Sequence, residues 1–338
     1  MKLARGRRAD LLLGLVQEKL LDRAKGLSSK YFPRGVTVAL DVTKDPYYGR
    51  SRSKFVTGSK AERGPTRFFQ FLGAPLLEKT CKFPLGLKML EKEWLKDLDK
   101  IVIKFLTEIG KSIQIGLVVL DRGFCWARVV NKLQQAGSSF VIGMKRSSGV
   151  KKVIRAIQSH GNRPGQAFSV DGLDIVVRQL TGHCWLVEGF KYGSPAGKVN
   201  LVIYRVKGKV KRNQKRKKGD REYLPFVTSE DVGPLEVLAI YGKRWRIETA
   251  FRQIKAVRGW TRTANAQVRA WLLGVAAVLY ASWVERNFLV DRNSRQRGDL
   301  AQEVHETDDT APFRPQIIQR RMRENYYQLL EALGPELC

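Results

Sequence analysis

The sequence predicts an α/β protein in which a mixed β-sheet is flanked by helices and interrupted by a β-rich insertion. Three observations predict this class. Two short segments rich in apolar and β-branched residues, Val36–Val42 and Ile115–Leu120, each bring the chain to an aspartate. Segments with the helical spacing of apolar residues separate the expected strands. Between residues 146 and 228 the pattern changes to a series of short strands.

The first expected strand, Val36–Val42, follows a mostly helical segment over residues 1–34 and carries Asp41 near its end. An aspartate at the exit of a buried strand is costly unless it is paired or binds a metal ion. A strand-end aspartate whose oxygens accept backbone amides is an equally good interpretation. Asp45 is a weaker candidate for the same role, because Pro46 marks it as part of a turn.

The segments that follow extend the sheet. The strand before Asp121 is almost wholly apolar, as expected for a strand covered on both faces in a parallel sheet. The expected elements are the strands Lys54–Thr57 and Thr66–Leu72, the helix Leu87–Ile109, the strand Ile115–Leu120, the helix Ala127–Ala136 and the strand Ser139–Lys145. This order resembles that of a ribonuclease-H-like core, whose first and fourth strands are adjacent and parallel. Asp41 and Asp121 would then emerge side by side at the carboxyl ends of those strands.

The segment from residue 146 to residue 228 is the expected β-rich insertion. Its short β patterns are Ala167–Val170, Leu173–Gln179, Cys184–Phe190 and Val199–Val206. Trp185 is a candidate for stacking on a DNA base, although a core tryptophan is the simpler interpretation. The run Lys207–Lys218 holds eight cations, among them Lys215, Arg216, Lys217 and Lys218. This run either clamps phosphates or is a solvated loop without a specific role.

A helix is expected from Tyr241 to Lys255. At about 100° per residue, Tyr241, Arg244, Glu248 and Lys255 share one narrow stripe. Ile247, Ala250, Ile254 and Val257 form the opposite, core-facing stripe. A carboxylate flanked by two cations and a phenol suits an acid that sits beside a phosphate chain, whereas the alternative is an amphipathic helix with an ordinary charged face.

Composition limits the class of partner. The 338 residues include 62 Lys and Arg against 32 Asp and Glu, which gives a net charge of +30 at pH 7. Such an excess opposes compaction and favours a polyanion, most simply nucleic acid; a general basic bias, or a ribosomal or membrane-surface role, is the alternative. The four cysteines form no Cys-x2-Cys pair, which is typical of a reduced, cytoplasmic chain. Nucleotide-binding glycine motifs are absent. The longest uncharged run, residues 270–284, is too short to span a membrane, and we expect it to form a buried helix.

The spacing Tyr-x2-Arg-x3-Glu-x6-Lys at Tyr241, Arg244, Glu248 and Lys255 resembles the signature of DDE transposases of the insertion sequence 4 type. That family also requires an aspartate after a first strand and an aspartate in an Asp-x-Gly-Phe/Tyr setting. Asp41 and the segment Asp121-Arg122-Gly123-Phe124 match these two requirements.

The resemblance implies metal-dependent DNA cleavage at transposon ends, followed by strand transfer into target DNA. Asp41, Asp121 and Glu248 would hold two Mg²⁺ or Mn²⁺ ions, with Asp41 bridging both. Arg244, Lys255 and Tyr241 would hold phosphates. The implied partners are transposon-end and target DNA, bound by a homodimer associated with the nucleoid, with no nucleotide cofactor and no membrane. The alternatives are a nuclease of the same fold that does not join strands, and a non-catalytic basic DNA-binding protein.

The expected organisation has five parts. They are an N-terminal helical segment (residues 1–34), a first part of the core (35–145), the insertion (146–228), a second part of the core with Glu248 (229–290) and a C-terminal helical segment (291–338). In the C-terminal segment we expect a polar turn at Asp291–Asp299 and a last helix over Pro315–Leu333. Relatives often carry a DNA-recognition domain before the core, and residues 1–34 are few for one. Either that domain is missing or other surfaces read the DNA ends.

Overall fold

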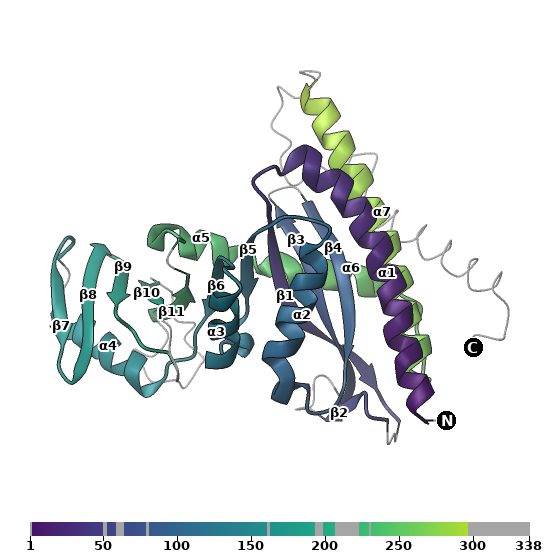
Figure 1. Ribbon diagram of the computed structural model, residues 1–338, viewed down its shortest axis with the longest axis horizontal. Coiled ribbons are helices and arrows are strands. Elements are labelled where there is room, and N and C mark those ends of the chain that lie inside the picture. Colours follow the sequence, from purple (N-terminus) through teal and green to yellow (C-terminus); the bar gives the residue numbers. More distant parts are fainter. Residues whose placement is uncertain are drawn as a thin grey trace. The chain divides into compact units, whose positions relative to one another are not determined.

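The computed structural model describes residues 2–49, 53–58, 64–78, 81–160, 163–192, 199–206, 223–229 and 231–296. The fold is α/β, as predicted, with strands in a mixed sheet and helices against them (Figure 1). The chain divides into two compact units. One comprises residues 1–96, 108–114 and 245–338, and the other comprises residues 97–107 and 115–244.

The first unit is built on antiparallel strands arranged around β3 (Arg67–Glu78). β3 pairs with β1 (Val36–Tyr47), β2 (Val56–Gly58) and β4 (Cys81–Leu90). All of its residues from Phe68 to Leu77 are buried, so both of its faces are covered. Burial of this largely apolar strand on two faces stabilises the unit.

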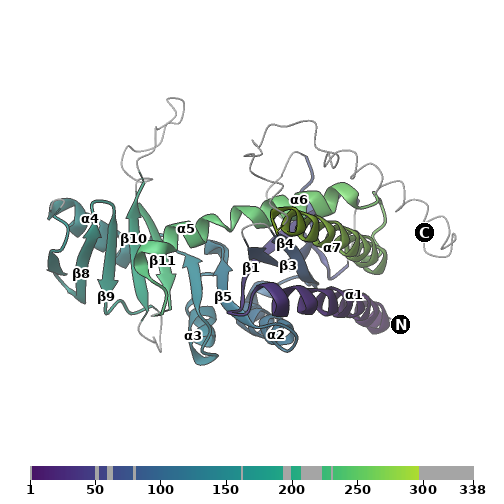
Figure 2. The same ribbon diagram turned by 90° about the horizontal axis from the view of Figure 1, so that it is seen from above.

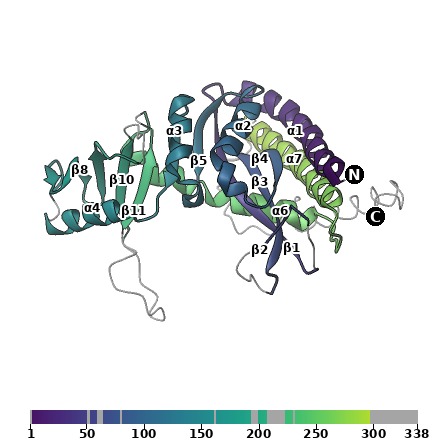
Figure 3. The same ribbon diagram turned by 60° about the horizontal axis from the view of Figure 1, so that its bottom comes forward.

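Three helices cover the strands of the first unit. α1 (Lys2–Tyr31) and α7 (Ala266–Gln296) lie side by side and pack against β4, as Figures 1 and 2 both show. Arg23 of α1 joins Glu285 of α7 through an Nη2–Oε2 ion pair of 2.6 Å. α6 (Trp245–Val257) packs on β1, β3 and β4 and on α7 (Figure 3). These contacts place α6 directly beside β1, the strand that carries Asp41.

Within the described residues, α7 is the one helix that is long and apolar enough to cross a membrane, over Ala266–Leu289. Just over half of its apolar window, 56%, is buried inside the protein. Because α7 packs against α1 and β4, it is accounted for as a core helix. The buried helix expected around residues 270–284 is therefore confirmed, and it is longer than predicted.

The second unit contains one parallel and several antiparallel pairs. β5 (Ile115–Leu120) runs parallel to β6 (Phe140–Gly143), and α3 (Ala127–Gln135) connects them. From β6 the sheet continues through antiparallel pairs. In order across the sheet, the strands are β11 (Tyr223–Thr228), β10 (Asn200–Arg205), β9 (Cys184–Glu188), β8 (Leu173–Thr181) and β7 (Ala167–Val170). α4 (Ser148–Ser159) precedes β7. Ser147 caps the N-terminus of this helix, because its Oγ accepts a hydrogen bond from the Val150 amide. Figure 1 shows these strands following one another across the unit.

The structure corrects the prediction of a helix over Leu87–Ile109. Cys81–Leu90 instead forms β4, a 3-10 turn follows at Trp94–Asp97, and the helix α2 is confined to Leu98–Gly110. Burial on both faces of β4 explains the error, because a doubly covered strand has no polar alternation to distinguish it from a helix. The core segment therefore contains four strands before α2 instead of the predicted three.

Two further expectations are changed or lie outside the described part of the chain. α7 continues to Gln296, through the start of the polar turn expected after Asp291. The expected last helix, Pro315–Leu333, falls among residues 297–338, which lie outside the described residues.

Candidate active site

Asp41 and Glu248 face a common pocket within the first unit. The pocket has a volume of about 380 Å³ and is lined by Asp41, Val42, Thr43, Lys44, Glu248, Phe251, Arg252 and Lys255. Its wall therefore consists of one edge of β1 and one face of α6. Two carboxylates and several cations meet here although more than 200 positions separate them in sequence.

A glycine on β3 sets how closely α6 approaches the strands. Gly73 lies opposite Asp41 in the β1–β3 register. A Cβ at Gly73 would stand only 2.4 Å from Cζ of Phe251 on α6. The Phe251 ring thus occupies space that any larger residue at position 73 would fill. This close packing holds Glu248, three residues earlier on the same helix, beside β1.

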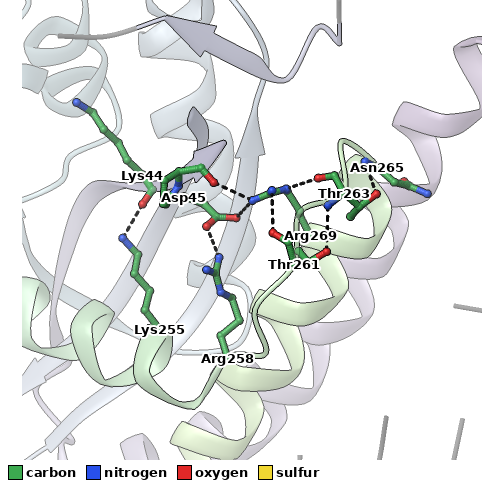
Figure 4. Close-up of polar contacts among 9 residues, drawn as sticks. Lys44, Asp45, Lys255, Arg258, Thr261, Thr263, Asn265 and Arg269 are labelled. Carbon is green, nitrogen blue, oxygen red and sulfur yellow. Dashed lines mark hydrogen bonds and ion pairs between the residues drawn. The ribbon is translucent and has the colours of Figure 1, made fainter. Parts of the chain in front are cut away.

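Hydrogen bonds to the backbone hold two of the charged side chains that line the pocket, Asp41 and Lys255. Oδ1 of Asp41 accepts the backbone amide of Val42 at 2.8 Å. The predicted strand end at Val42 is wrong, because β1 continues through Asp45 and Pro46 to Tyr47, so Asp41 lies inside the strand and Asp45 is not part of a turn. Nζ of Lys255 donates to the Lys44 carbonyl at 2.7 Å (Figure 4). Asp41 therefore accepts a backbone amide, although not at a strand end, and lines the pocket as well. The lysine ties the last turn of α6 to β1 and places its charge at the pocket wall.

In the second unit, Asp121 lies at the end of β5 and is held by Tyr241 and Arg244. The Tyr241 hydroxyl donates to Oδ1 of Asp121 at 3.0 Å, and Nε of Arg244 lies 3.7 Å from the same oxygen. The Arg244 guanidinium lies over the Tyr241 ring, 5.5 Å from its centre. Burial raises the pKa of Tyr241 above its ordinary value, and the Asp121 carboxylate adds to the rise. The phenol therefore stays protonated and acts as a hydrogen-bond donor to Asp121.

The Tyr241 ring is itself positioned by its surroundings. It packs against Phe226 with the ring centres 4.9 Å apart. A Cβ at Gly143 of β6 would lie 2.5 Å from the Tyr241 hydroxyl oxygen, so only glycine leaves room for the phenol. Neither Gly143 nor Gly73 belongs to a recognisable turn motif, so nothing in the sequence marks these two glycines as parts of a site.

The single helix predicted from Tyr241 to Lys255 is in fact two helices. α5 (Val237–Gly242) ends before Lys243 and Arg244, and α6 begins at Trp245. The chain passes from one unit to the other between Arg244 and Trp245. The prediction that four polar residues share one stripe of a continuous helix is therefore wrong. Tyr241 and Arg244 accompany Asp121, whereas Glu248 and Lys255 accompany Asp41.

Asp45 is excluded from the pocket by its own partners. Its side chain is 1% exposed and forms ion pairs with Arg258 and Arg269 (Figure 4). Arg269, 2% exposed, reaches Oδ2 of Asp45 at 2.6 Å. The sequence contained one hint of this network, because Arg269 directly precedes the longest uncharged run of the chain.

The structure also corrects the assignment of Trp185 to DNA. Trp185 is 2% exposed, and its ring lies 6.0 Å from that of Tyr223 within the second unit. A ring buried in this way presents no face to a base, so the alternative of a core tryptophan applies. The basic run, with Lys215, Arg216, Lys217 and Lys218, lies outside the described residues.

The oxygen ligands of this site fit a divalent cation. Asp41 and Glu248 supply carboxylates to one pocket, and hard Mg²⁺ or Mn²⁺ ions prefer such ligands. No group of three His, Cys, Asp or Glu side chains that could hold a metal ion occurs among the residues that the structure describes. Asp41 and Glu248 thus provide part of the ligand set for a divalent cation within the first unit, and a third carboxylate would complete that set.

A pocket whose wall combines carboxylates and cations suits the class of enzymes that act on phosphodiesters. Comparison with protein families agrees: residues 99–280, more than half of the chain, match the transposase DDE domain. The chain belongs to the DDE transposase family, which makes it a protein of mobile elements and of transposition. The matched range contains Asp121 and Glu248, and Asp41 precedes it. No curated protein matches the sequence.

Proposed function

We propose that this protein is a transposase of the insertion sequence 4 type, which cleaves DNA at transposon ends and joins the freed ends to target DNA. Asp41, Asp121 and Glu248 are the proposed catalytic carboxylates. The observation that carries the proposal is the pocket that Asp41 and Glu248 line together with Lys255. The hydrogen bond from Tyr241 to Asp121 supports the third assignment, since it fixes a carboxylate at the end of a parallel strand.

The proposed cofactor is a pair of Mg²⁺ or Mn²⁺ ions held by the three carboxylates. Bound there, the ions would stabilise the charge on the attacking and leaving oxygens of an in-line displacement. Without such cations the carboxylates would repel a phosphodiester.

The chain's own residues would bind and orient the DNA backbone. Lys255 and Arg252 line the pocket, where their charges attract phosphate oxygens. Tyr241 and Arg244 hold the Asp121 carboxylate in one orientation. In the first reaction, water attacks the phosphodiester at the transposon end and releases a 3′-hydroxyl. In the second, that hydroxyl attacks a target phosphodiester, so one bond forms as another breaks.

The organisation expected from the sequence belongs to the same proposal. Residues 35–145 and 229–290 would form the two parts of a ribonuclease-H-like core, with Asp41 and Asp121 side by side. Residues 146–228 would be an insertion that contacts DNA ends, and the protein would act as a homodimer on DNA. The strands β7–β10, which follow α4 and precede β11, support the assignment of a β-rich segment there.

The test is cleavage of plasmid DNA that carries the sequences flanking the gene, with Mg²⁺ present. Asp41→Asn, Asp121→Asn and Glu248→Gln should each abolish cleavage, because each removes one proposed metal ligand. A gel-shift assay in EDTA should show that all three still bind DNA. Glu188→Gln, at an exposed pair with Arg178, is the matched control and should cleave normally. Full cleavage by any of the three carboxylate variants would refute the assignment.

The two other functions are separated by the products. Incubating 3′-hydroxyl DNA ends with a target plasmid should give joined DNA. Cleavage without joining would indicate a nuclease of the same fold. Binding that only weakens with salt, with no cleavage, would indicate a non-catalytic DNA-binding protein.

A further inference from the structure

The loop between α6 and α7 presents an exposed tryptophan that the proposed chemistry does not use. Trp260 is 64% exposed, and the Arg262 guanidinium lies over its ring, 5.0 Å from the ring centre. Tryptophan is mostly buried in proteins, so a ring left open beside an exposed cation calls for an explanation. Stacking between an arginine and an aromatic ring keeps the ring face oriented and adds positive charge next to it.

The side chain of Arg269 anchors this loop through hydrogen bonds to its backbone. Arg269 donates from Nε to the Thr263 carbonyl at 2.8 Å and from Nη2 to the Thr261 carbonyl at 3.2 Å. Its Nη1 binds Oδ2 of Asp45 at 2.6 Å and the Pro46 carbonyl at 3.2 Å. One buried side chain thus ties both sides of the loop to the end of β1 (Figure 4).

The loop also holds its own backbone in place. The Thr263 amide donates to Oγ1 of Thr261 at 3.2 Å, and the Asn265 amide to Oγ1 of Thr263 at 3.1 Å. The Gln267 amide donates to Oδ1 of Asn265 at 3.0 Å. Such successive side-chain caps fix a loop locally. The backbone that follows Trp260 is therefore fixed, and the Arg262 contact orients the ring, which lowers the entropy lost when a ligand stacks on it.

The anchors of the loop are continuous with the candidate active site. Lys44 of β1 lines the pocket, and the next two residues, Asp45 and Pro46, hold Arg269. On α6, Lys255 lines the same pocket and Arg258 pairs with Asp45 one turn later. Trp260 follows Arg258 by two residues. The loop that carries Trp260 is therefore anchored beside the wall of the pocket. Arg258 and Arg269 are themselves paired with Asp45, so the exposed cation next to the ring is Arg262.

We propose that Trp260, with Arg262 beside it, is a stacking platform for an unpaired nucleobase of the DNA strand next to the pocket. A flat ring with a cation beside it matches a base and its phosphate, and base stacking on an aromatic ring tolerates any base sequence. This inference rests on the proposed action on DNA and names the form of DNA that the site accepts. Paired bases are stacked within the duplex, so the platform selects strands that are frayed, tailed or opened.

The test compares two DNA probes in EDTA, where cleavage does not interfere. One is a blunt duplex and the other is the same duplex with a short single-stranded 3′ tail that carries 2-aminopurine. The wild-type protein should bind the tailed duplex at least about 5-fold more tightly, the gain expected for one stacked base. It should also quench the 2-aminopurine fluorescence. Equal affinity for both probes without quenching, or no binding to either, would overturn the proposal.

Variants then assign the effect to the ring. Trp260→Leu should bring the affinity ratio close to one and remove the quenching, while Trp260→Phe should keep most of both. Trp126→Leu is the matched control, because Trp126 is also exposed and carries Arg128 over its ring. An equal loss in Trp126→Leu would refute a specific platform. So would a change in oligomeric state, instead of in the affinity ratio, on replacing Trp260, because a second copy of the chain would then be the occupant.

The proposal and the proposed function fail in different ways. Metal-dependent cleavage with no preference for the tailed duplex would remove the platform and leave the transposase. A tail preference that depends on Trp260, together with no cleavage, would leave the platform and remove the catalytic assignment.

Discussion

Asp45 illustrates how strongly a residue's role depends on what surrounds it. It lies four positions after Asp41 on β1, yet it is buried between Arg258 and Arg269 while Asp41 lines the pocket. Both arginines come from segments more than 200 positions away. The sequence pointed to Asp41 over Asp45 through Pro46, but it could not supply the two partners, because nothing local brings them together.

Replacing Asp45 by Asn should destabilise the protein substantially. The change removes the only negative charge in the ion pairs of Asp45 with Arg258 and Arg269 and leaves two cations close together inside the fold. Breaking a buried pair by removing one partner costs about 3–5 kcal/mol. Urea denaturation followed by circular dichroism would measure the loss as a lower midpoint at unchanged slope.

The control for this prediction is an exposed pair. Arg178 and Glu188 have side-chain exposures of 51% and 42%, and such pairs contribute at most about 1 kcal/mol. Glu188→Gln should therefore scarcely move the midpoint. An Asp45→Asn protein as stable as Glu188→Gln would show that the network around Arg269 carries little stability.

At the scale of elements, the helix α6 positions Glu248 and Lys255 only because β3 lets it come close. The contact of Phe251 with Gly73 is the narrowest point of that packing. The spacing of apolar residues in the sequence predicted that α6 has a buried face. It did not predict which strand lies beneath it, because that depends on the pairing of β3 with β1, which joins distant parts of the chain.

Gly73→Ala should push Phe251 off β3 and move α6 with it. Overpacking of this kind costs about 1–3 kcal/mol. Cleavage should fall as well, since Glu248 would shift relative to Asp41. Thermal or urea unfolding gives the first effect, and cleavage at increasing Mg²⁺ concentration gives the second as a raised metal requirement.

Gly58→Ala provides the comparison, because a Cβ at Gly58 meets no atom within 4 Å. That variant should match the wild type in both measurements. If Gly73→Ala behaves in the same way, the packing of Phe251 does not position α6.

Other elements show where local patterns mislead. β5 and α3 were predicted well, because an apolar run between turn residues and a helical period are both local signals. β4 was taken for a helix because it is buried on both faces. The break between α5 and α6 had a single local hint, Gly242, and no proline marks it. That break changes which polar residues belong together, so helical spacing alone was insufficient.

At the scale of the whole molecule, the chain crosses between its two units at four points, and the last crossing separates Tyr241 and Arg244 from Glu248 and Lys255. Asp41 and Glu248 belong to one unit and Asp121 to the other. The fold class, the family and the net charge of +30 were accessible from the sequence, because they depend on composition and on motif spacing. The proposed catalytic residues were also chosen from the sequence, and their joint action remains the central proposal.

Localised cleavage of the protein by iron tests that proposal most directly. Fe²⁺ takes oxygen ligands and can replace Mg²⁺, and with peroxide it produces hydroxyl radicals that cut the polypeptide close to the ion. With DNA bound, the account predicts cuts near Asp41, near Asp121 and near Glu248, all suppressed by excess Mg²⁺. Mass spectrometry of the fragments would locate them. Cuts near Asp41 and Glu248 with none near Asp121 would contradict a shared metal site of three carboxylates.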